Sequence, residues 1–120
     1  MNLNSVTNYC GVTCNVVRKY DLDGALSIEY FQNNDKIEGT EIIYNLHYYQ
    51  HHNKICILSI EHYIDNKKHG TSNGYYDNGL KMDELYFINN NMNGLYKYYD
   101  RAGIFVRDEY YINNILQFRF

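Results

Sequence analysis

A pattern that recurs along the chain constrains the fold more than any single motif. A glutamate, an aromatic residue two positions later and an Asn-containing turn follow one another four times, and a glycine comes next in the first three cases. The recurring positions are Glu29, Phe31 and Gly39, then Glu61, Tyr63 and Gly70, then Glu84, Tyr86 and Gly94, and finally Glu109 and Tyr111. Self-similarity at a period of about two dozen residues predicts an array of short repeated units.

The turns of this pattern are of two kinds. One kind is rich in asparagine, as at Asn89-Asn90, and asparagine is the non-glycine residue that best tolerates the left-handed backbone region. The other kind ends in Gly24, Gly79 or Gly103, because glycine takes a positive φ at little steric cost. Two turns in each unit predict two strands in each unit.

Between the turns, the sequence is typical of β-strands. Tyrosine accounts for 15 of the 120 residues, and its ring suits a half-buried strand whose hydroxyl group stays in water. There is no proline to interrupt a ladder of main-chain hydrogen bonds, and no stretch shows a sustained helical period with caps. We therefore predict an all-β fold, a repeat array of antiparallel β-hairpins that forms an elongated twisted sheet or open solenoid of about eight strands.

The repeat divides the chain into an N-terminal cap and about four units. Residues 1–15 lack a strong period and are interpreted as an irregular cap. The units are residues 16–44, 45–74, 75–97 and 98–120. The second unit is the irregular one, with a Tyr-Tyr motif within residues 46–49, a turn at residues 50–53 and a strand over residues 54–63. Its additional residues predict a longer hairpin or a bulge.

The irregular unit also contains the residues that most resemble metal ligands. His47, His51, His52 and Cys56 follow one another closely. Neither a Cys-x-x-Cys pair nor a His-Glu-x-x-His motif is present among them. The two alternatives are a polar hairpin loop and a metal site, and we favour the polar hairpin loop. We predict no cofactor.

Composition and charge argue against several classes of function. The net charge is -3 and the pI is about 5.9, whereas a general binder of nucleic acid needs a basic face. No apolar run approaches the roughly 20 residues that cross a membrane, and the N-terminus lacks the basic and apolar regions of a secretory signal. The cysteines Cys10, Cys14 and Cys56 are interpreted as reduced thiols of an intracellular, cytoplasmic protein.

The recurring glutamates do not indicate an active site. A pair of carboxylates can hydrolyse a glycosidic bond, but a residue that occurs once in each unit is more simply a structural device. No Gly-rich phosphate loop and no Ser/His/Asp set is recognisable either. The sequence therefore predicts no enzyme activity and no catalytic residues.

The recurring motifs resemble the MORN repeat family in its shorter variant. That variant has the approximate form Tyr-x-Asn-Gly-x-x-x-Gly, then Tyr-Tyr-x-x-Gly-x-Leu, then Glu-x-x-Tyr. The matching stretches are Tyr63-Ile64-Asp65-Asn66-Lys67-Lys68-His69-Gly70, Phe87-Ile88-Asn89-Asn90-Asn91-Met92-Asn93-Gly94, Tyr111-Ile112-Asn113-Asn114, Tyr75-Tyr76-Asp77-Asn78-Gly79 and residues 98–103. The chain departs from the family in three ways: asparagine replaces the first turn glycine, Phe118 replaces the last glycine, and there is no Trp.

The resemblance implies a function as well as a fold. Arrays of this family are interaction scaffolds, some bacterial members look like antitoxins, and similar arrays with this Asn, Ile and Tyr bias are encoded by large DNA viruses of amoebae. The resemblance thus implies a non-catalytic scaffold that binds a protein partner. The acidic net charge and the lack of a basic face predict that this partner is neither nucleic acid nor a membrane. The alternative is an antitoxin or immunity-like protein whose acidic surface captures a basic, nuclease-like partner. An exposed edge strand at the C-terminal end also allows homo-oligomers.

Overall fold

The structure is a computed structural model that describes residues 15–119. These residues form one open antiparallel sheet of 11 strands, with one helix in the connection between the third and the fourth strand along the chain. In chain order the elements are β1 (Asn15–Tyr20), β2 (Leu26–Asn33), β3 (Lys36–Tyr44), α1 (Leu46–His52), β4 (Ile57–Ile64), β5 (Lys67–Lys68), β6 (Gly70–Tyr75), β7 (Lys81–Ile88), β8 (Asn91–Met92), β9 (Gly94–Tyr99), β10 (Phe105–Ile112) and β11 (Ile115–Arg119). The predicted all-β hairpin array is confirmed, with more strands than expected.

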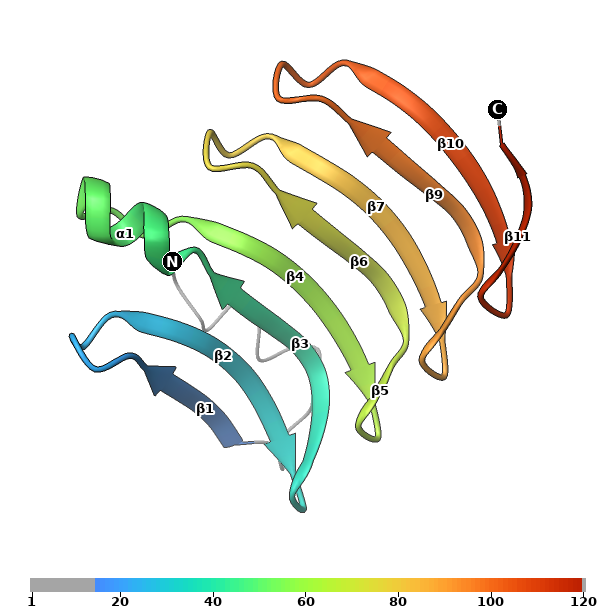
Figure 1. Cartoon of the computed structure of the whole chain (residues 1–120). Helices are drawn as coiled ribbons and strands as arrows, with labels where there is room; N and C mark the ends of the chain where they lie inside the picture. The colour runs from blue at the N-terminus through green and yellow to red at the C-terminus, as the bar shows by residue number, and fades with distance from the viewer. Residues whose placement is uncertain (1–14, 120) are drawn as a thin grey trace.

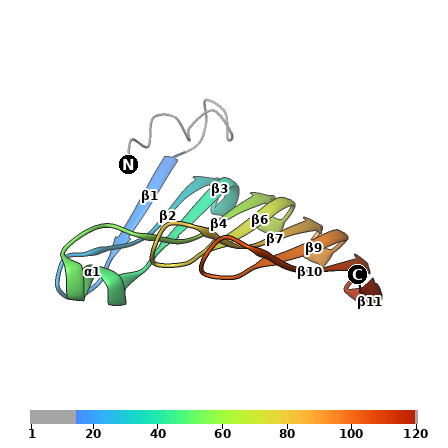
Figure 2. The same cartoon turned by 90° about the horizontal axis from the view of Figure 1, so that it is seen from above.

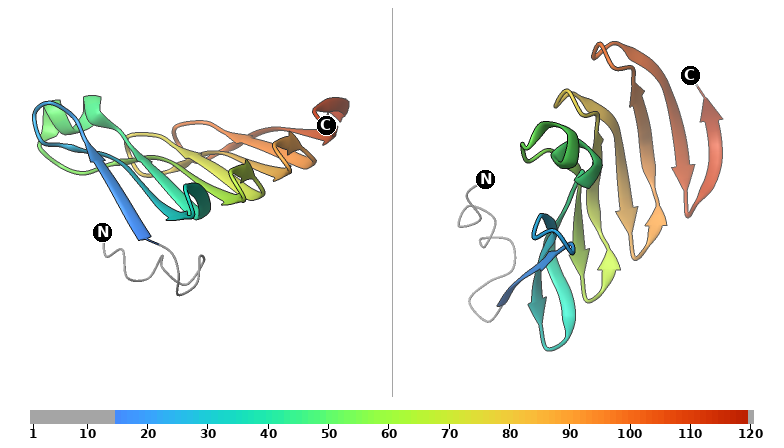
Figure 3. Two further views of the ribbon diagram at one scale, coloured as in Figure 1. Left: turned by 90° about the horizontal axis from the view of Figure 1, so that it is seen from below. Right: turned by 60° about the vertical axis from the view of Figure 1, so that its left-hand side comes forward.

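Nine strands lie side by side in the order β1-β2-β3-β4-β6-β7-β9-β10-β11, and the short strands β5 and β8 extend two of the turns (Figure 1). The sheet is thin and twisted when it is seen from above (Figure 2), and the hairpins follow one another along one direction (Figure 3). The Cα radius of gyration is 15.5 Å, larger than the roughly 13.6 Å of a compact domain of this length. The predicted cap, including Cys10 and Cys14, lies outside the described residues apart from Asn15.

The Asn-rich turns are two-residue hairpin loops along one edge of the sheet. Both loop residues have positive φ, with values of 50° and 65° at Asn34 and Asp35 in the first turn and 46° and 69° at Asn113 and Asn114 in the last. Two consecutive positive φ angles define the type I′ turn, whose twist matches that of the flanking strands. The predicted left-handed role of asparagine is confirmed in the later turns, whereas the first turn, predicted at Asn33-Asn34, lies one residue further on, at Asn34 and Asp35.

The glycine turns lie at the opposite edge of the sheet (Figure 1). The N–H group of Gly103 donates to the carbonyl oxygen of Asp100 at 3.0 Å, and Gly24 donates to Asp21 in the same way at 3.1 Å. The carboxylate of Asp100 also accepts a hydrogen bond from the N–H group of Ile104 at 3.0 Å. Both glycines have a φ of 83°, a conformation that closes a three-residue hairpin loop.

The spacing of the turns gives the length of the repeat. Asn66, Asn90 and Asn114, the second residues of three Asn-rich turns, are 24 positions apart, whereas Asp35 and Asn66 are 31 positions apart. The excess of seven residues (31 − 24) equals the length of α1. The second unit is therefore a standard unit with an inserted helix, and the prediction of a longer hairpin with a turn at residues 50–53 is wrong.

Asparagine residues begin and end the inserted helix. The side-chain oxygen of Asn45 accepts a hydrogen bond from the N–H group of Tyr48 at 3.0 Å, which is the geometry of an N-cap. At the other end, Asn53 has a left-handed φ of 53° and donates to the carbonyl oxygen of Tyr49. The helix occupies residues that the sequence reading assigned to a turn, and β4 accordingly begins at Ile57 and not at residue 54.

Asparagine also joins each unit to the next. The side-chain oxygen of Asn66 accepts from the N–H group of Ile37 at 2.7 Å, while the N–H group of Asn66 donates to the carbonyl oxygen of Ile37 at 3.1 Å. Asn90 makes the same pair of bonds with Lys68, at 2.8 and 2.9 Å. Together with Asn114 and Met92, these contacts form a ladder of three junctions along the turn edge, which we call the asparagine ladder.

The four glutamates of the sequence pattern do not occupy equivalent positions. Glu29 and Glu84 stand five residues before the first residue of their turns, whereas Glu61 and Glu109 stand four residues before theirs. An offset of one residue places a side chain on the opposite face of a sheet. The four glutamates therefore belong to two sets of positions, one on each face, although each of them accepts hydrogen bonds within the sheet.

Strand register defines the two faces. Along one row, Glu29 pairs with Ile42, Ile42 with Ile60, and Ile60 with Asn73. The row continues through Glu84, Lys97 and Asp108, and we call this side the Glu29 face. Glu61 and Glu109 lie on the other side, which we call the Glu61 face.

The core lies in the N-terminal half of the sheet. The buried apolar side chains among the described residues are Ala25, Phe31, Ile42 and Tyr44, all in or beside β2 and β3. Glu29 is also buried there, and its carboxylate accepts hydrogen bonds from the hydroxyl of Tyr44 and, at 3.1 Å, from Arg18. Large apolar residues are exposed in both halves, but in the C-terminal half none of the described apolar side chains is buried.

Candidate functional site

An exposed apolar row crosses the C-terminal half of the Glu29 face. It consists of Tyr86, Leu95, Tyr110 and Phe118, on β7, β9, β10 and β11. Leu95 and Phe118 are the cross-strand neighbours of Tyr110, and Tyr86 stands two residues beyond Glu84 on the same face. Tyr86 and Leu95 are each 42% exposed and Phe118 is 55% exposed. Four neighbouring strands thus present apolar groups side by side.

The apolar row is ordered by contacts within the sheet. The rings of Tyr110 and Phe118 are stacked, with their centroids 5.5 Å apart. On the opposite face, the buried carboxylate of Glu109 is held at 2.6 Å from Arg119, whose hydrogen bond lowers the pKa of Glu109 below its usual value. These bonds attach β11 to β10 on both faces, so the row is presented by a fixed strand and not by a loop.

A charged row runs beside the apolar row on the same face. Lys97 lies between Glu84 and Asp108 in the strand register, and the carboxylate of Glu84 also accepts from the ammonium group of Lys81 at 3.0 Å. One carboxylate oxygen of Asp108 is buried and has no hydrogen-bond partner among the described residues. An apolar strip flanked by charges has the composition of a protein-binding surface, with an apolar centre and a polar rim.

A pair of carboxylates lies on the opposite face, in the centre of the sheet. Glu41 and Glu61 are directly opposite each other on β3 and β4. The hydroxyl of Tyr63 lies 3.2 Å from Glu61 and 3.4 Å from Glu41, and Lys68 forms an ion pair with Glu61 at 3.1 Å. Burial and the charge of Glu61 raise the pKa of Glu41 above its usual value of 4.5. Glu61 is therefore compensated directly, whereas Glu41 is the less favourable charge.

We expect the variant Glu41→Gln to be more stable than the wild-type protein at neutral pH. A carboxyl group whose pKa is raised in the folded state loses stability as the pH rises from its unfolded value through its folded value, because the folded state must then accept the charge. The gain should vanish as the pH falls below 4.5, where both states are protonated. Urea unfolding at a series of pH values measures it. Glu84→Gln, which loses its Lys81 partner, is the control, and a gain equal to that of Glu41→Gln would contradict the expectation.

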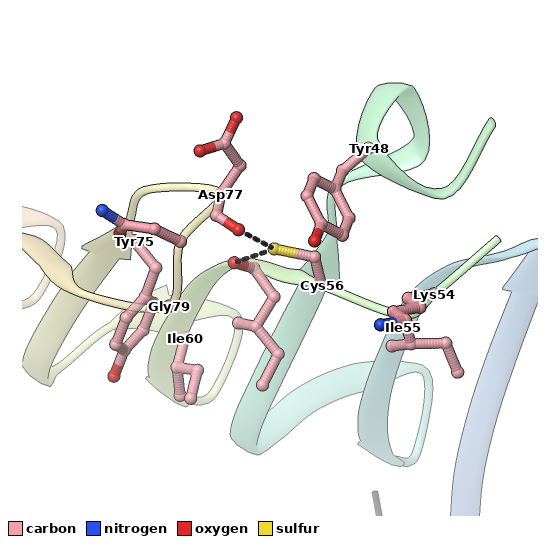
Figure 4. A pocket seen from close by; sticks show the side chains of 10 residues that line it. Tyr48, Lys54, Ile55, Cys56, Ile60, Tyr75, Asp77 and Gly79 are labelled. Carbon is pink, nitrogen blue, oxygen red and sulfur yellow. Dashed lines mark hydrogen bonds between the residues drawn. The ribbon is translucent and has the colours of Figure 1, made fainter. Parts of the chain in front are cut away.

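A cavity of about 470 Å³ lies between the segment that follows α1 and the turn between β6 and β7 (Figure 4). Its wall is formed by Tyr48, Lys54, Ile55, Cys56, Ile57, Ile60, Tyr75, Asp77, Asn78 and Gly79. The inserted helix creates this cavity, because Tyr48 and the segment after α1 form its far wall. A volume in the range of about 300–1,000 Å³ suits a small molecule or an inserted side chain.

The polar groups of the cavity do not form a catalytic pair. The sulfur of Cys56 lies 3.7 Å from the main-chain carbonyl oxygen of Asp77. Burial, assisted by the charge of Asp77, raises the pKa of the Cys56 thiol above 9.0. A thiol with a raised pKa stays protonated near neutral pH and is a poor nucleophile. The carboxylate of Asp77 forms an ion pair with Arg101, so it is engaged away from the thiol.

The histidines that resembled metal ligands lie on α1, where their rings contact one another or Tyr48 at a tilted angle. The ring centroids of His47 and His51 are 4.2 Å apart, and those of Tyr48 and His52 are also 4.2 Å apart. His51 is bonded through Nδ1 to the carbonyl oxygen of His47 at 2.8 Å. In residues 15–119 no group of three His, Cys, Asp or Glu side chains is arranged to hold a metal ion. None of the helical structure described is long and apolar enough to cross a membrane.

The residues singled out in the sequence serve the turns and junctions more than the apolar row. Gly39, Gly70 and Gly94 each stand opposite an aromatic residue of the next strand, with φ between 83° and 102°. Of the recurring aromatic residues, only Tyr86 belongs to the apolar row. Leu95, Tyr110 and Phe118 were not singled out as a surface, because their proximity depends on strand register and not on sequence spacing.

Comparisons with known proteins do not show a family for the chain. No family model matches the sequence, and no curated protein matches it. One solved structure that matches the chain is described as accessory secretory protein 1, 2 and 3 in Streptococcus pneumoniae, with 15% sequence identity and a TM-score of 0.48. The match covers 83% of this chain but 17% of that chain, so this chain spans a small part of the other protein. The likeness is too weak to support an argument about function.

Proposed function

We propose that this protein is a non-catalytic protein-binding scaffold built of MORN-like repeats. The observation that carries the proposal is the apolar row on an open single-layer sheet, in which Tyr86, Leu95 and Phe118 are exposed and Tyr110 is half-buried. Contiguous exposed apolar groups on a soluble protein mark interaction surfaces. Tyrosine adds a large contact area at a low cost in conformational entropy.

The repeat organisation supports the MORN-like part of the proposal. Each regular unit has 24 residues, an Asn-rich turn at one edge and a glycine turn at the other. Such an array adds length without adding a core, because each unit contacts only its neighbours. A scaffold benefits from this geometry, since every added hairpin extends the surface that a partner can contact.

The proposed partner binds the Glu29 face and is a folded protein. Its contact surface would be apolar at the centre, to cover the apolar row, and would carry both signs of charge at the margin. The charged row of Glu84, Lys97 and Asp108 then stays at the rim, where charges set orientation more than affinity.

Affinity capture with paired variants tests the proposed function. The double variant Tyr86→Ala/Leu95→Ala removes two neighbouring exposed members of the apolar row, and we expect it to lower the amount of captured partner about tenfold or more, because a few large apolar residues dominate binding energy. Leu80→Ala is the control, since Leu80 is 43% exposed but lies beside a glycine turn. Equal capture by the double variant and the wild-type protein would overturn the proposal.

The identity of the captured protein separates the scaffold from the alternative. Recovery of one small basic protein in equal amount would make an antitoxin or immunity-like role the better description, because an acidic chain captures a basic partner by charge complementarity. Recovery of several proteins that all depend on Tyr86 and Leu95 would favour a general scaffold.

A further inference from the structure

The asparagine ladder specifies what one unit needs from the next. At each of its three junctions, a single residue uses both its N–H group and its carbonyl oxygen to bind an asparagine in the turn of the following unit. These residues are Ile37, Lys68 and Met92, and each lies two positions after the second residue of its own turn. These three residues contribute only main-chain atoms to the contact, so the contact does not depend on their side chains.

Leu116 occupies the same position in the last described unit. It lies two positions after Asn114 and pairs with Tyr111 on β10, as Met92 pairs with Phe87 on β7. By this equivalence, the N–H group and the carbonyl oxygen of Leu116 point away from β10. The strand order ends at β11, so among the described residues no turn meets them. Five consecutive residues of β11 are exposed.

Gln117 on β11 stands where internal junctions make a second contact. At two of the three junctions the N–H group of the first turn residue donates to a side chain one position after the ladder residue, from Asp65 to Glu38 at 2.8 Å and from Asn113 to Asn93 at 3.0 Å. Gln117 stands at that position in β11. The amide nitrogen of Gln117 is bonded to the carbonyl oxygen of Ile115 at 3.1 Å, which leaves its amide oxygen to accept.

Two features indicate that the occupant is a different protein and not a second copy. Asn66, Asn90 and Asn114 already bind ladder residues within the chain. The fourth Asn-rich turn, Asn34-Asp35, follows β2, and the outer edge of β2 is already paired with β1. In addition, Phe118 replaces the glycine of the internal junctions and pairs directly with Tyr110. The register of β11 beyond Gln117 therefore differs from that of β6 and β9, and a unit of identical sequence does not continue it.

We propose that the open edge of β11 binds a β-hairpin of a partner protein whose turn carries Asn or Asp at its second position. The side-chain oxygen of that residue accepts from the N–H group of Leu116, its own N–H group donates to the carbonyl oxygen of Leu116, and the preceding N–H group donates to Gln117. This is strand addition to a sheet edge, with an Asx contact that fixes the register. The inference rests on the proposed function only in taking the partner to be a protein.

A peptide that copies an internal junction tests this inference. The probe is a synthetic peptide with the sequence of residues 81–92, which contains the turn Asn89-Asn90, titrated into the isotopically labelled full chain and followed by NMR. We expect the amide signals of Leu116 and Gln117 to shift and their hydrogen exchange to slow. A peptide with Asn90→Ala should bind about tenfold more weakly, because it lacks the side-chain acceptor.

Two variants of the protein complete the test. Leu116→Pro removes the N–H group at an edge position that tolerates proline and should abolish peptide binding, whereas Leu116→Ala keeps the main chain and should bind as the wild-type protein does. Equal binding of the two peptides, or unchanged binding by Leu116→Pro, would overturn the proposal. Failure of the wild-type peptide to bind would also overturn the proposal. So would a shift of the β11 signals with protein concentration alone, because it would indicate that a second copy binds this edge. The comparison of the two peptides uses the wild-type chain, so it tests the proposal even if a variant does not fold.

The edge contact at Leu116 and the role of the apolar row can be tested separately. A partner that is lost from Tyr86→Ala/Leu95→Ala but kept by Leu116→Pro would support the proposed function and overturn the edge contact. The reverse result would support the edge contact and overturn the role of the apolar row.

Discussion

Replacing Glu29 by alanine is expected to lower the free energy of unfolding by about 3 kcal/mol. Glu29 is 3% exposed, and its carboxylate accepts hydrogen bonds from Arg18 and from the hydroxyl of the buried Tyr44. Without the carboxylate, the buried hydroxyl of Tyr44 loses an acceptor in a place that water reaches poorly, and the more exposed guanidinium of Arg18 loses an ion partner. Equilibrium unfolding in urea, followed by circular dichroism, measures the change.

The repeat itself supplies the control for this experiment. Glu84 is the residue at the equivalent position of its unit, on the same face, but its side chain is 36% exposed and its ion partner is Lys81. Exposed ion pairs contribute up to about 1 kcal/mol, so Glu84→Ala should cost no more than that. Glu29→Gln, which keeps an acceptor for Tyr44, should fall between the two. Similar losses for Glu29→Ala and Glu84→Ala would contradict the assignment of the core to β2 and β3.

The second large effect is expected at Phe31. This residue is 3% exposed, and replacing a buried phenylalanine by alanine removes apolar contacts and leaves a cavity, which costs about 3–5 kcal/mol. Phe31→Ala should therefore shift the urea midpoint strongly, and thermal unfolding should show the same order of stabilities.

Tyr86 is the matched position for Phe31, because both stand three residues before the first residue of their turn. Tyr86 is 42% exposed, so Tyr86→Ala should change stability by less than about 1 kcal/mol. The two variants thus separate two uses of one repeat position, a core residue in the first unit and a surface residue in the third. A loss of stability at Tyr86 as large as that at Phe31 would show that the apolar row is part of a core and not a binding surface.

The turns could be predicted from the sequence because their chemistry is local. Asparagine and glycine at fixed spacing identify the positions with positive φ, and positive φ at Asn89 and Asn90, or at Gly79, follows from the residue types alone. Alternating strands between such turns can form little else than antiparallel hairpins. The all-β array therefore follows from sequence periodicity.

The inserted helix was missed for a physical reason. The segment Leu46–His52 is short, and histidine and tyrosine have only middling helix propensity. Its helical state depends on the caps at Asn45 and Asn53, and asparagine serves a turn equally well. The seven extra residues of this unit were the available signal, because a hairpin loop of regular length does not need them.

The sequence by itself determined the repeat, the turns and the β class, since each depends on residues that are close together in the chain. The tertiary structure decided which glutamates are equivalent, which strands carry the core and which residues meet in the apolar row. These properties depend on strand register, and a slip of one residue moves a side chain to the opposite face of the sheet. Glu29 and Glu61 look alike in the sequence pattern. Glu29 stands five residues before its turn and Glu61 stands four residues before its turn, so the two side chains lie on opposite faces of the sheet.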